Sequence, residues 1–444
     1  MDNQDRGLTI DNAISWLNDN DITEGERGLC IVINFCLTHG DFEMHFLLKR
    51  DGSQALDSGC LRSNVEQYTR FGESIGFNKS IRLIFLSWRN PQGPINEQHY
   101  QCIQSFYRGI ESNTSITDLS MDLECIGIRA NRVDESFPRF NFQETPITSN
   151  LEKFEFLQNK YRVTTFKEDA TTLIIQALQS ISQVKLLDIS CLPISESAFP
   201  RIISACPSPM NSLNISCDTA HHCSTLAVYF QSNRLMVSSL EVGKVYGRRP
   251  EKLSQQEAST IINGLKNGAV PLNTLSMNCR IGNTYLTSVQ TLLCDTTSIE
   301  SIRSSNHTLT ELKPFPEFEV NHRIIVLSPE EEVKFEIIED SLILNENSNK
   351  NKVIREKIAW YYFVGDFDVS PLSSLPVSVL PSVLVMIKGK KLDRQSAIFR
   401  LLKSIPDLCN VGSRMKIDCN DDDDDHDIEG AKFGACGNKR RRKT

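Results

Sequence analysis

The stretch Leu151-Glu152-Lys153-Phe154-Glu155-Phe156-Leu157-Gln158-Asn159-Lys160-Tyr161 decides the fold. Apolar residues stand at its positions one, four and six, an asparagine at position nine and a further apolar residue two positions later. Side chains alternate between the two faces of a strand, so Phe154 and Phe156 share one face and the charged residues beside them share the other. A central strand of a doubly wound sheet is instead buried on both faces and nearly continuous in apolar residues. The stretch therefore predicts a short strand with one buried and one polar face.

The same register recurs along the chain. The further copies are Ile81/Ile84/Leu86, Ile116/Leu119/Met121, Val184/Leu187/Ile189, Met210/Leu213/Ile215, Val237/Leu240/Val242, Leu272/Leu275/Met277 and Ile299/Ile302/Ser304. Apolar residues with a period of three to four lie between several of them, at 100–110, 174–181 and 258–265, and predict helices. Ser254 and Glu257 form a capping-box pattern at the start of the last of these. Strand and helix are therefore expected to alternate.

This pattern is the LxxLxLxxN strand of a leucine-rich repeat. One strand-helix unit cannot bury its apolar face alone, so neighbouring units stack. The predicted fold is α/β: a leucine-rich-repeat solenoid, or horseshoe, with a parallel concave sheet, convex helices and a helical C-terminal cap. The long helical patterns favour the ribonuclease-inhibitor type. The alternative is a doubly wound α/β domain, which also alternates strand and helix.

Four regions are expected along the chain. Residues 1–60 form an N-terminal cap and a degenerate first repeat, and residues 61–312 form the solenoid. Residues 313–412 form the helical C-terminal cap, in which Ser328-Pro329-Glu330-Glu331 begins a helix with apolar positions Val333, Phe335, Ile338 and Leu342. Residues 413–444 form a disordered tail that is acidic and then basic.

Part of the sequence resembles a known but uncharacterised family. The segment that starts at Phe367-Asp-Val-Ser-Pro-Leu, the segment Ser396-Ala-Ile-Phe-Arg-Leu-Leu and the junction Ser305-Asn306-His307-Thr308-Leu309 are similar to a leucine-rich-repeat family abundant in diatoms. The resemblance covers residues 80 to 412 and implies the fold only, because that family brings no established activity, cofactor or site residue.

Composition bounds the function. The 444 residues carry a formal net charge of −8, which argues against nucleic acid and favours a basic partner. The 14 cysteines are scattered without paired spacing, so reduced thiols are expected. The N-terminus has no secretory pattern and no apolar run is long enough for a membrane span. We expect an intracellular monomer, cytoplasmic or nuclear, with no cofactor.

The polar positions of the predicted strands are the candidate partner contacts, because they face away from the helices. They are Phe85, Trp88, Asp118, Asp122, Glu152, Lys153, Glu155, Lys185, Asp188 and Glu241. Phe85 and Trp88 are aromatic residues of the kind enriched at interfaces, and the alternative is that the N-terminal cap covers them. The other eight candidate residues are net acidic, and the alternative is that they only form a solvated face.

The tail holds a second candidate. Asp421 to Asp425 precede Lys439, Arg440, Arg441, Arg442 and Lys443, a basic block of the nuclear-import type. The alternative is a solvated tail in which the two blocks pair with each other.

Catalytic and metal motifs are weak. Gly72-Glu73-Ser74-Ile75-Gly76 matches a nucleophile elbow, but the strand that should precede it is missing. Cys217, His221, His222 and Cys223 have no second pair at zinc spacing. No catalytic residue and no metal ligand is therefore assigned.

The predicted function is a non-enzymatic protein-binding scaffold. The alternative is a regulator of a small GTPase, because the fold resembles the activating proteins of Ran-type GTPases, which also carry an acidic tail.

Overall fold

The computed structural model describes residues 9–19, 29–38, 41–50, 57–62, 64–89, 95–129, 132–143, 145–157, 165–244, 252–266, 270–313 and 328–358. All of them belong to one compact unit, Met1–Gly365. Asn159, Tyr161, residues 359–412 of the expected cap and the tail with its basic block 439–443 lie outside the described residues.

The unit is built on an 11-stranded sheet. Eight parallel strands lie side by side in chain order: β4 (Ile81–Arg89), β5 (Asp118–Met121), β8 (Lys153–Phe156), β9 (Leu186–Asp188), β10 (Met210–Ser216), β11 (Val237–Gly243), β12 (Thr274–Met277) and β13 (Glu311–Lys313). β1 (Leu29–Thr38) pairs with β4 in parallel and continues into antiparallel β2 (Asp41–Arg50) and β3 (Asp57–Arg62) at the edge. The strands of the region expected as an N-terminal cap and degenerate first repeat, residues 1–60, thus belong to the same sheet. A small second sheet joins β6 (Ile128–Arg129) and β7 (Arg132–Val133).

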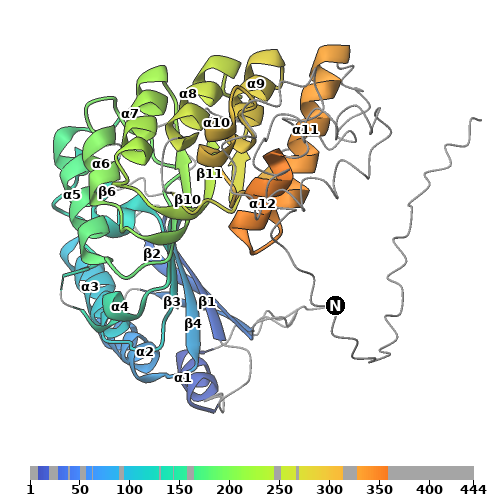
Figure 1. Cartoon of the computed structure of the whole chain (residues 1–444). Coiled ribbons are helices and arrows are strands. Elements are labelled where there is room, and N and C mark those ends of the chain that lie inside the picture. The colour runs from blue at the N-terminus through green and yellow to red at the C-terminus, as the bar shows by residue number, and fades with distance from the viewer. Residues whose placement is uncertain are drawn as a thin grey trace, which may run out of the picture. The chain divides into compact units, whose positions relative to one another are not determined.

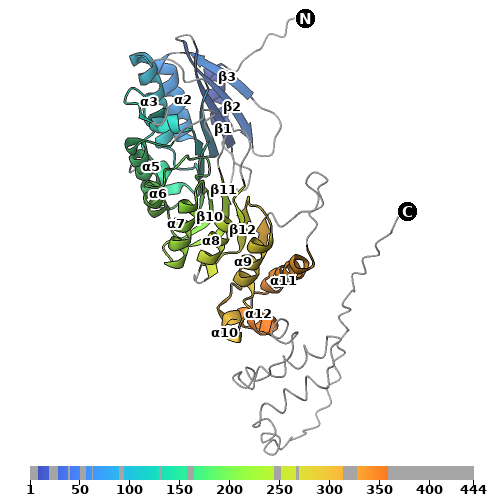
Figure 2. The same cartoon turned by 90° about the horizontal axis from the view of Figure 1, so that it is seen from above.

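Helices alternate with the strands. They are α1 (Ile10–Asp19), α2 (Val65–Phe77), α3 (Glu97–Glu111), α4 (Pro146–Asn150), α5 (Glu168–Ser180), α6 (Phe199–Ala205), α7 (Ala220–Gln231), α8 (Gln255–Lys266), α9 (Asn283–Leu293), α10 (Ile299–Ser304), α11 (Pro329–Asn345) and α12 (Lys350–Lys357), with a 3-10 turn, η1 (Leu123–Ile126). Figures 1 and 2 show α2, α3 and α5 to α9 along one face of the sheet, and no described helix covers the other face of β4 to β11. We call that other face the open face.

One apolar row explains the stacking. The paired residues Ile84, Leu119, Phe154, Leu187, Leu213, Leu240, Leu275 and Leu312 run across all eight parallel strands. Every one of them is buried. These are the central apolar positions of the repeated register, so seven of the eight expected copies coincide with strands. Burying this row beneath the helices removes apolar surface from water and so stabilises the stack.

The eighth expected copy is wrong. Residues 299–304 form helix α10, whose N-cap Ser298 accepts a hydrogen bond at 3.0 Å from the backbone N–H of Ser301. Ile299 and Ile302 are three residues apart, a spacing that fits one turn of a helix as well as the first part of the strand pattern. The strand at this place is β13, which follows the helix.

The last described helices lie close to the end of the sheet. α11 begins with a complete capping box between Ser328 and Glu331, as the sequence predicts. It packs against α9, and Ile338 is fully buried. Val333, expected among the buried positions, is 56% exposed instead. In the described part of the chain, no helix combines the length and apolar character of a membrane span.

Candidate functional site: the open face of the sheet

Two rows of side chains cross the open face. They alternate with the buried row, so they point away from the helices. The first row contains Asp118, Lys153, Leu186, Ser212, Ser239, Thr274 and Glu311. The second contains Phe85, Ser120, Glu155, Asp188, Asn214, Glu241, Ser276 and Lys313. The strand register therefore brings most of the predicted contact residues onto one surface.

The middle of this face is acidic. The charged side chains in its two rows are Asp118, Glu155, Asp188 and Glu241 against Lys153, and Glu152 and Lys185 stand immediately before β8 and β9. Lys185 Nζ lies 2.6 Å from Glu152 Oε1, and Lys153 Nζ lies 3.7 Å from Glu155 Oε2. Two of the five carboxylates are thus paired with lysines, and the acidic excess remains. Glu241 is exposed and forms no ion pair with another described residue.

Local environment differs among these carboxylates. Burial raises the pKa of Asp118, an effect that the nearby Lys153 opposes. Asp188 accepts hydrogen bonds from Asn214 Nδ2 at 2.8 Å and from both the backbone N–H and the hydroxyl of Ser190, at 2.9 and 2.7 Å. Asp188 therefore also fixes the turn after β9, and replacing it would change structure as well as charge.

Trp88 and Asp122, both predicted as partner contacts, are buried. Their exposed fractions are 7% and 5%. The Trp88 ring packs between Phe35 of β1 and Phe137, with ring centroids 5.1 and 5.0 Å away. The alternative that the N-terminal region covers the aromatic residues therefore applies to Trp88. Phe137, from the segment between β7 and α4, contacts Trp88 as well. Phe85 remains half-buried on the open face.

The open face changes from acidic to apolar at Phe85. It pairs across the sheet with Val32 of β1, which pairs in turn with Leu47 of β2. All three side chains are half-buried and lie in one row. The open face is consequently apolar over β2, β1 and β4 and acidic over β5 to β11.

The weak catalytic motif is a helix-packing motif. Ser74 lies within α2 and its hydroxyl donates to the carbonyl oxygen of Arg70 at 2.8 Å, a contact within the helix. Gly72 and Gly76 face the backbone of α3, so a Cβ on Gly72 would come within 2.8 Å of the carbonyl oxygen of Phe106. These glycines allow the two helices to approach closely.

Of the residues weighed as metal ligands, His222, Cys217 and Cys223 pack in the interior, whereas His221 is exposed. The ring of His222 stacks on Phe199 with centroids 4.2 Å apart, and its Nδ1 accepts the backbone N–H of Asp218 at 3.2 Å. Cys217 and Cys223 are fully buried, and burial raises the pKa of the Cys217 thiol. A raised thiol pKa disfavours the thiolate that binds metal.

A three-residue ligand cluster that the sequence analysis overlooked lies at the other end of the sheet. Glu43 and His45 of β2 and Cys60 of β3 have ligand atoms within 4.8 Å of one another. The alternation Glu-x-His on one strand was visible in the sequence, but only the register of β2 with β3 brings Cys60 beside it.

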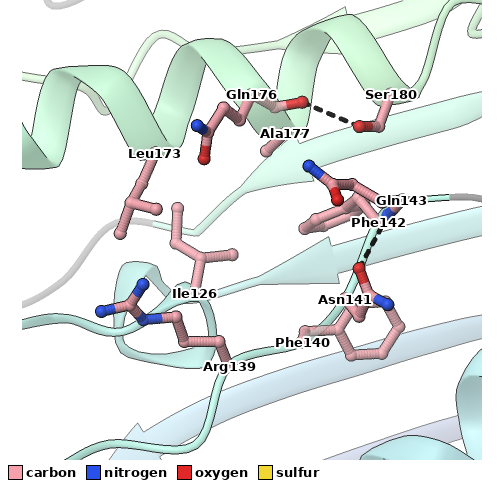
Figure 3. Close-up of a pocket in the computed structure, with 10 residues that line it drawn as sticks. All are labelled: Ile126, Arg139, Phe140, Asn141, Phe142, Gln143, Leu173, Gln176, Ala177 and Ser180. Atoms are coloured by element: carbon pink, nitrogen blue, oxygen red, sulfur yellow. Dashed lines mark hydrogen bonds between the residues drawn. The ribbon is translucent and has the colours of Figure 1, made fainter. Parts of the chain in front are cut away.

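A pocket of about 310 Å³ lies between α5 and residues 139–143, as Figure 3 shows. Its walls are Ile126, Arg139, Phe140, Asn141, Phe142, Gln143, Leu173, Gln176, Ala177 and Ser180. The Ser180 hydroxyl donates to the carbonyl oxygen of Gln176 at 2.9 Å. Arg139 is the single ionisable residue of this lining, so the pocket holds no nucleophile with a general base.

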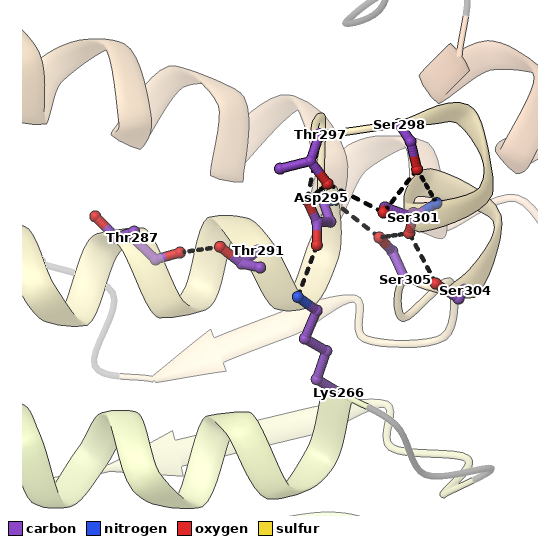
Figure 4. Close-up of polar contacts among 9 residues, drawn as sticks. All are labelled: Lys266, Thr287, Thr291, Asp295, Thr297, Ser298, Ser301, Ser304 and Ser305. Carbon is purple, nitrogen blue, oxygen red and sulfur yellow. Dashed lines mark hydrogen bonds and ion pairs between the residues drawn. The ribbon is translucent and has the colours of Figure 1, made fainter. Parts of the chain in front are cut away.

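A group of hydroxyl and charged side chains surrounds the start of α10 (Figure 4). Asp295 accepts hydrogen bonds from Lys266 Nζ at 2.6 Å and from the Thr297 hydroxyl at 2.7 Å. Burial opposes ionisation of Asp295, but these hydrogen bonds outweigh it and lower the pKa of the carboxyl. The group therefore stabilises the junction between α8, α9 and α10.

The sequence matches no protein-family model and no curated protein. The resemblance to the diatom family stays an expectation.

Proposed function

We propose that the chain is a leucine-rich-repeat solenoid of the ribonuclease-inhibitor type, and that it acts as a non-enzymatic scaffold whose open, concave face binds a protein partner with a basic surface. The acidic row over β5 to β11 is the single observation that carries this proposal.

The arrangement of elements supports the repeat interpretation. The eight parallel strands follow chain order without reversal, and they share one buried apolar row. A doubly wound sheet has helices on both faces and reverses its strand order at a switch point. Here the described helices α2, α3 and α5 to α9 lie on one face (Figures 1 and 2). The exposed sheet is then the natural binding surface of the stack.

The side chains define the partner. Glu155 and Asp188 lie in one row on the neighbouring strands β8 and β9, and Glu241 lies in the same row two strands further on, with about 4.8 Å between adjacent strands. A basic surface would gain attraction and a faster association rate from such a row. The apolar patch of Val32, Leu47 and Phe85 beside it supplies contacts that do not depend on charge. We therefore expect a partner with lysines or arginines next to an apolar patch.

Charge reversal on the open face tests this proposal. The face variant carries Glu152→Lys, Glu155→Lys and Glu241→Lys, and leaves the structural Asp188 in place. The matched control carries Glu73→Lys, Glu336→Lys and Glu346→Lys. These exposed residues lie in α2, in α11 and at the C-cap of α11.

Both variants change the net charge equally, so nonspecific charge effects cancel. Each tagged full-length protein would be used to capture partners from native cell extract, with quantitative mass spectrometry of the bound fraction. We expect one or more proteins to be retained by the wild type and the control and lost by the face variant. Equal retention by all three proteins would contradict a partner site on this face.

A further inference from the structure

The edge hairpin places three different metal-ligand side chains on the open face. In the pairing of β2 with β3, His45 lies directly opposite Cys60. Glu43 is two residues before His45, so it projects from the same face of β2. The intervening Met44 and the following Phe46 are buried toward the helices. Glu43, His45 and Cys60 therefore converge on the solvent-accessible side.

The spacing of the ligand atoms is close to that of a tetrahedral site. Bonds of about 2.0 to 2.3 Å set neighbouring ligand atoms about 3.3 to 3.6 Å apart around zinc. His45 Nε2 and Glu43 Oε2 are already 3.4 Å apart. All three ligand atoms lie within 4.8 Å of one another, so the thiol must move by about one ångström, which rotation of an exposed side chain provides.

We propose that Glu43, His45 and Cys60 bind a zinc-class divalent transition-metal ion, with the fourth coordination position open to solvent. Thiolate, imidazole and carboxylate are the ligand types of zinc, whereas Mg²⁺ and Ca²⁺ prefer oxygen ligands alone. The two anionic ligands neutralise the charge of the ion. On binding, the thiol proton of Cys60 is released to solvent, so affinity rises with pH.

A neighbouring arginine is compatible with this site. Arg62 Nε lies 3.3 Å from Glu43 Oε1, the carboxylate oxygen that does not face His45. The Arg62 side chain is 88% exposed, so solvent screens the repulsion between its guanidinium and the bound cation. One oxygen of Glu43 thus pairs with the arginine while the other stays directed at the metal position.

Metal binding here would join the edge strand to its neighbour. β3 is the terminal strand of the sheet and pairs only with β2 among the described strands. A metal bridge between Cys60 and His45 adds a cross-strand link that is lost on unfolding. Any ion that binds only the folded state stabilises it by mass action. Zinc should therefore raise the melting temperature.

The test uses the full chain, reduced and stripped of metal, and titrates it with Co²⁺. A tetrahedral site with a thiolate gives near-ultraviolet charge-transfer absorption and intense visible bands. We expect one Co²⁺ equivalent with this spectrum, displaced by Zn²⁺, in the wild type and its loss in Cys60→Ser. The matched control is Cys30→Ser, a half-buried cysteine of the adjacent strand β1 on the same face. It should keep the full signal.

His45→Gln supplies a second variant that removes no thiol. It should lower the cobalt affinity at least tenfold and abolish the zinc-dependent rise in melting temperature. Because His45 and Cys60 are at the surface, both variants should melt like the wild type in chelator. If Cys60→Ser and Cys30→Ser bind the same number of cobalt ions with the same spectrum, the site does not exist. An undiminished zinc effect in His45→Gln would contradict it equally.

Discussion

The carboxylate of Asp122 accepts the backbone N–H of Trp88 at 2.7 Å, which connects the ends of β4 and β5 inside the molecule. Truncation in Asp122→Ala leaves that buried N–H without this acceptor, at a cost of about 1–3 kcal/mol. Asp122→Asn keeps an acceptor oxygen and should lose clearly less. Urea unfolding followed by tryptophan fluorescence measures both. Equal losses in the two variants would show that the acceptor is unimportant.

A glycine pair sets the distance between α2 and α3. A Cβ on Gly109 would lie 2.1 Å from the backbone carbon of Gly72, and a backbone atom cannot rotate away. We expect Gly109→Ala to lower the free energy of unfolding by about 2–3 kcal/mol, despite the better helix propensity of alanine. Gly243→Ala is the control, because nothing lies within 4 Å of its added Cβ. A comparable loss in both variants would exclude the steric explanation.

Lys357 should make stability depend on pH. Its amino group donates to the carbonyl oxygens of Leu293 at 2.7 Å and Asn306 at 3.2 Å, and burial lowers the pKa of Lys357 to about 7. The unfolded chain then binds a proton that the folded chain lacks between that value and the ordinary lysine pKa. Stability therefore rises with pH across this window.

Relative to Lys357→Met, the wild type should gain about 2 kcal/mol between pH 7 and pH 9. Urea titrations of both proteins at the two pH values measure this gain. The contributions of groups that titrate equally in the two proteins cancel in the difference. Lys352→Met, an exposed residue of the same helix, should show no such change. Parallel pH profiles for wild type and Lys357→Met would refute the prediction.

Glu257, in the N-terminal cap of α8, should also make stability depend on pH, in this case through a lowered carboxyl pKa. Burial opposes ionisation of Glu257, but hydrogen bonds from Lys244 at 2.8 Å and from the backbone N–H of Ser254 at 2.7 Å lower its pKa. A lowered carboxyl pKa gives stability that is present above the unfolded value and lost as pH falls through the folded one. Glu257→Gln should cost about 1 kcal/mol at pH 7 and less at pH 3.

The comparison variant for this cap is Glu241→Gln, an exposed carboxylate of β11. Its stability should follow the wild type at both pH values in thermal or urea unfolding. A Glu257→Gln deficit that persists at pH 3 would assign the loss to packing and not to charge.

The sequence predicts the strands well where one row must be buried. Leu119, Phe154 and Leu187 are separated by long segments, yet their shared register places them in one buried row. The pattern fails at 299–304 because three-residue spacing also suits a helix, and Ser298 caps one there. Periodicity alone does not distinguish the two cases.

The site was predictable only in part. Glu155 and Asp188 follow from alternation along each strand, and they do lie on the open face. Trp88 is covered by Phe137, which belongs to an insertion without the repeat register and so gives no signal in sequence. Cys60 meets His45 only through the pairing of two antiparallel strands, which local patterns do not specify.

Chain order and spatial order coincide from β4 to β13. Each of these strands therefore pairs with the strand that precedes it in this series and with the one that follows it. On the proposed repeat architecture, deleting or duplicating one interior strand with its helix would shorten or lengthen the row of carboxylates without rethreading the chain. On the proposed function, the number of charges offered to a partner could then change in evolution by whole units, independently of the surrounding topology.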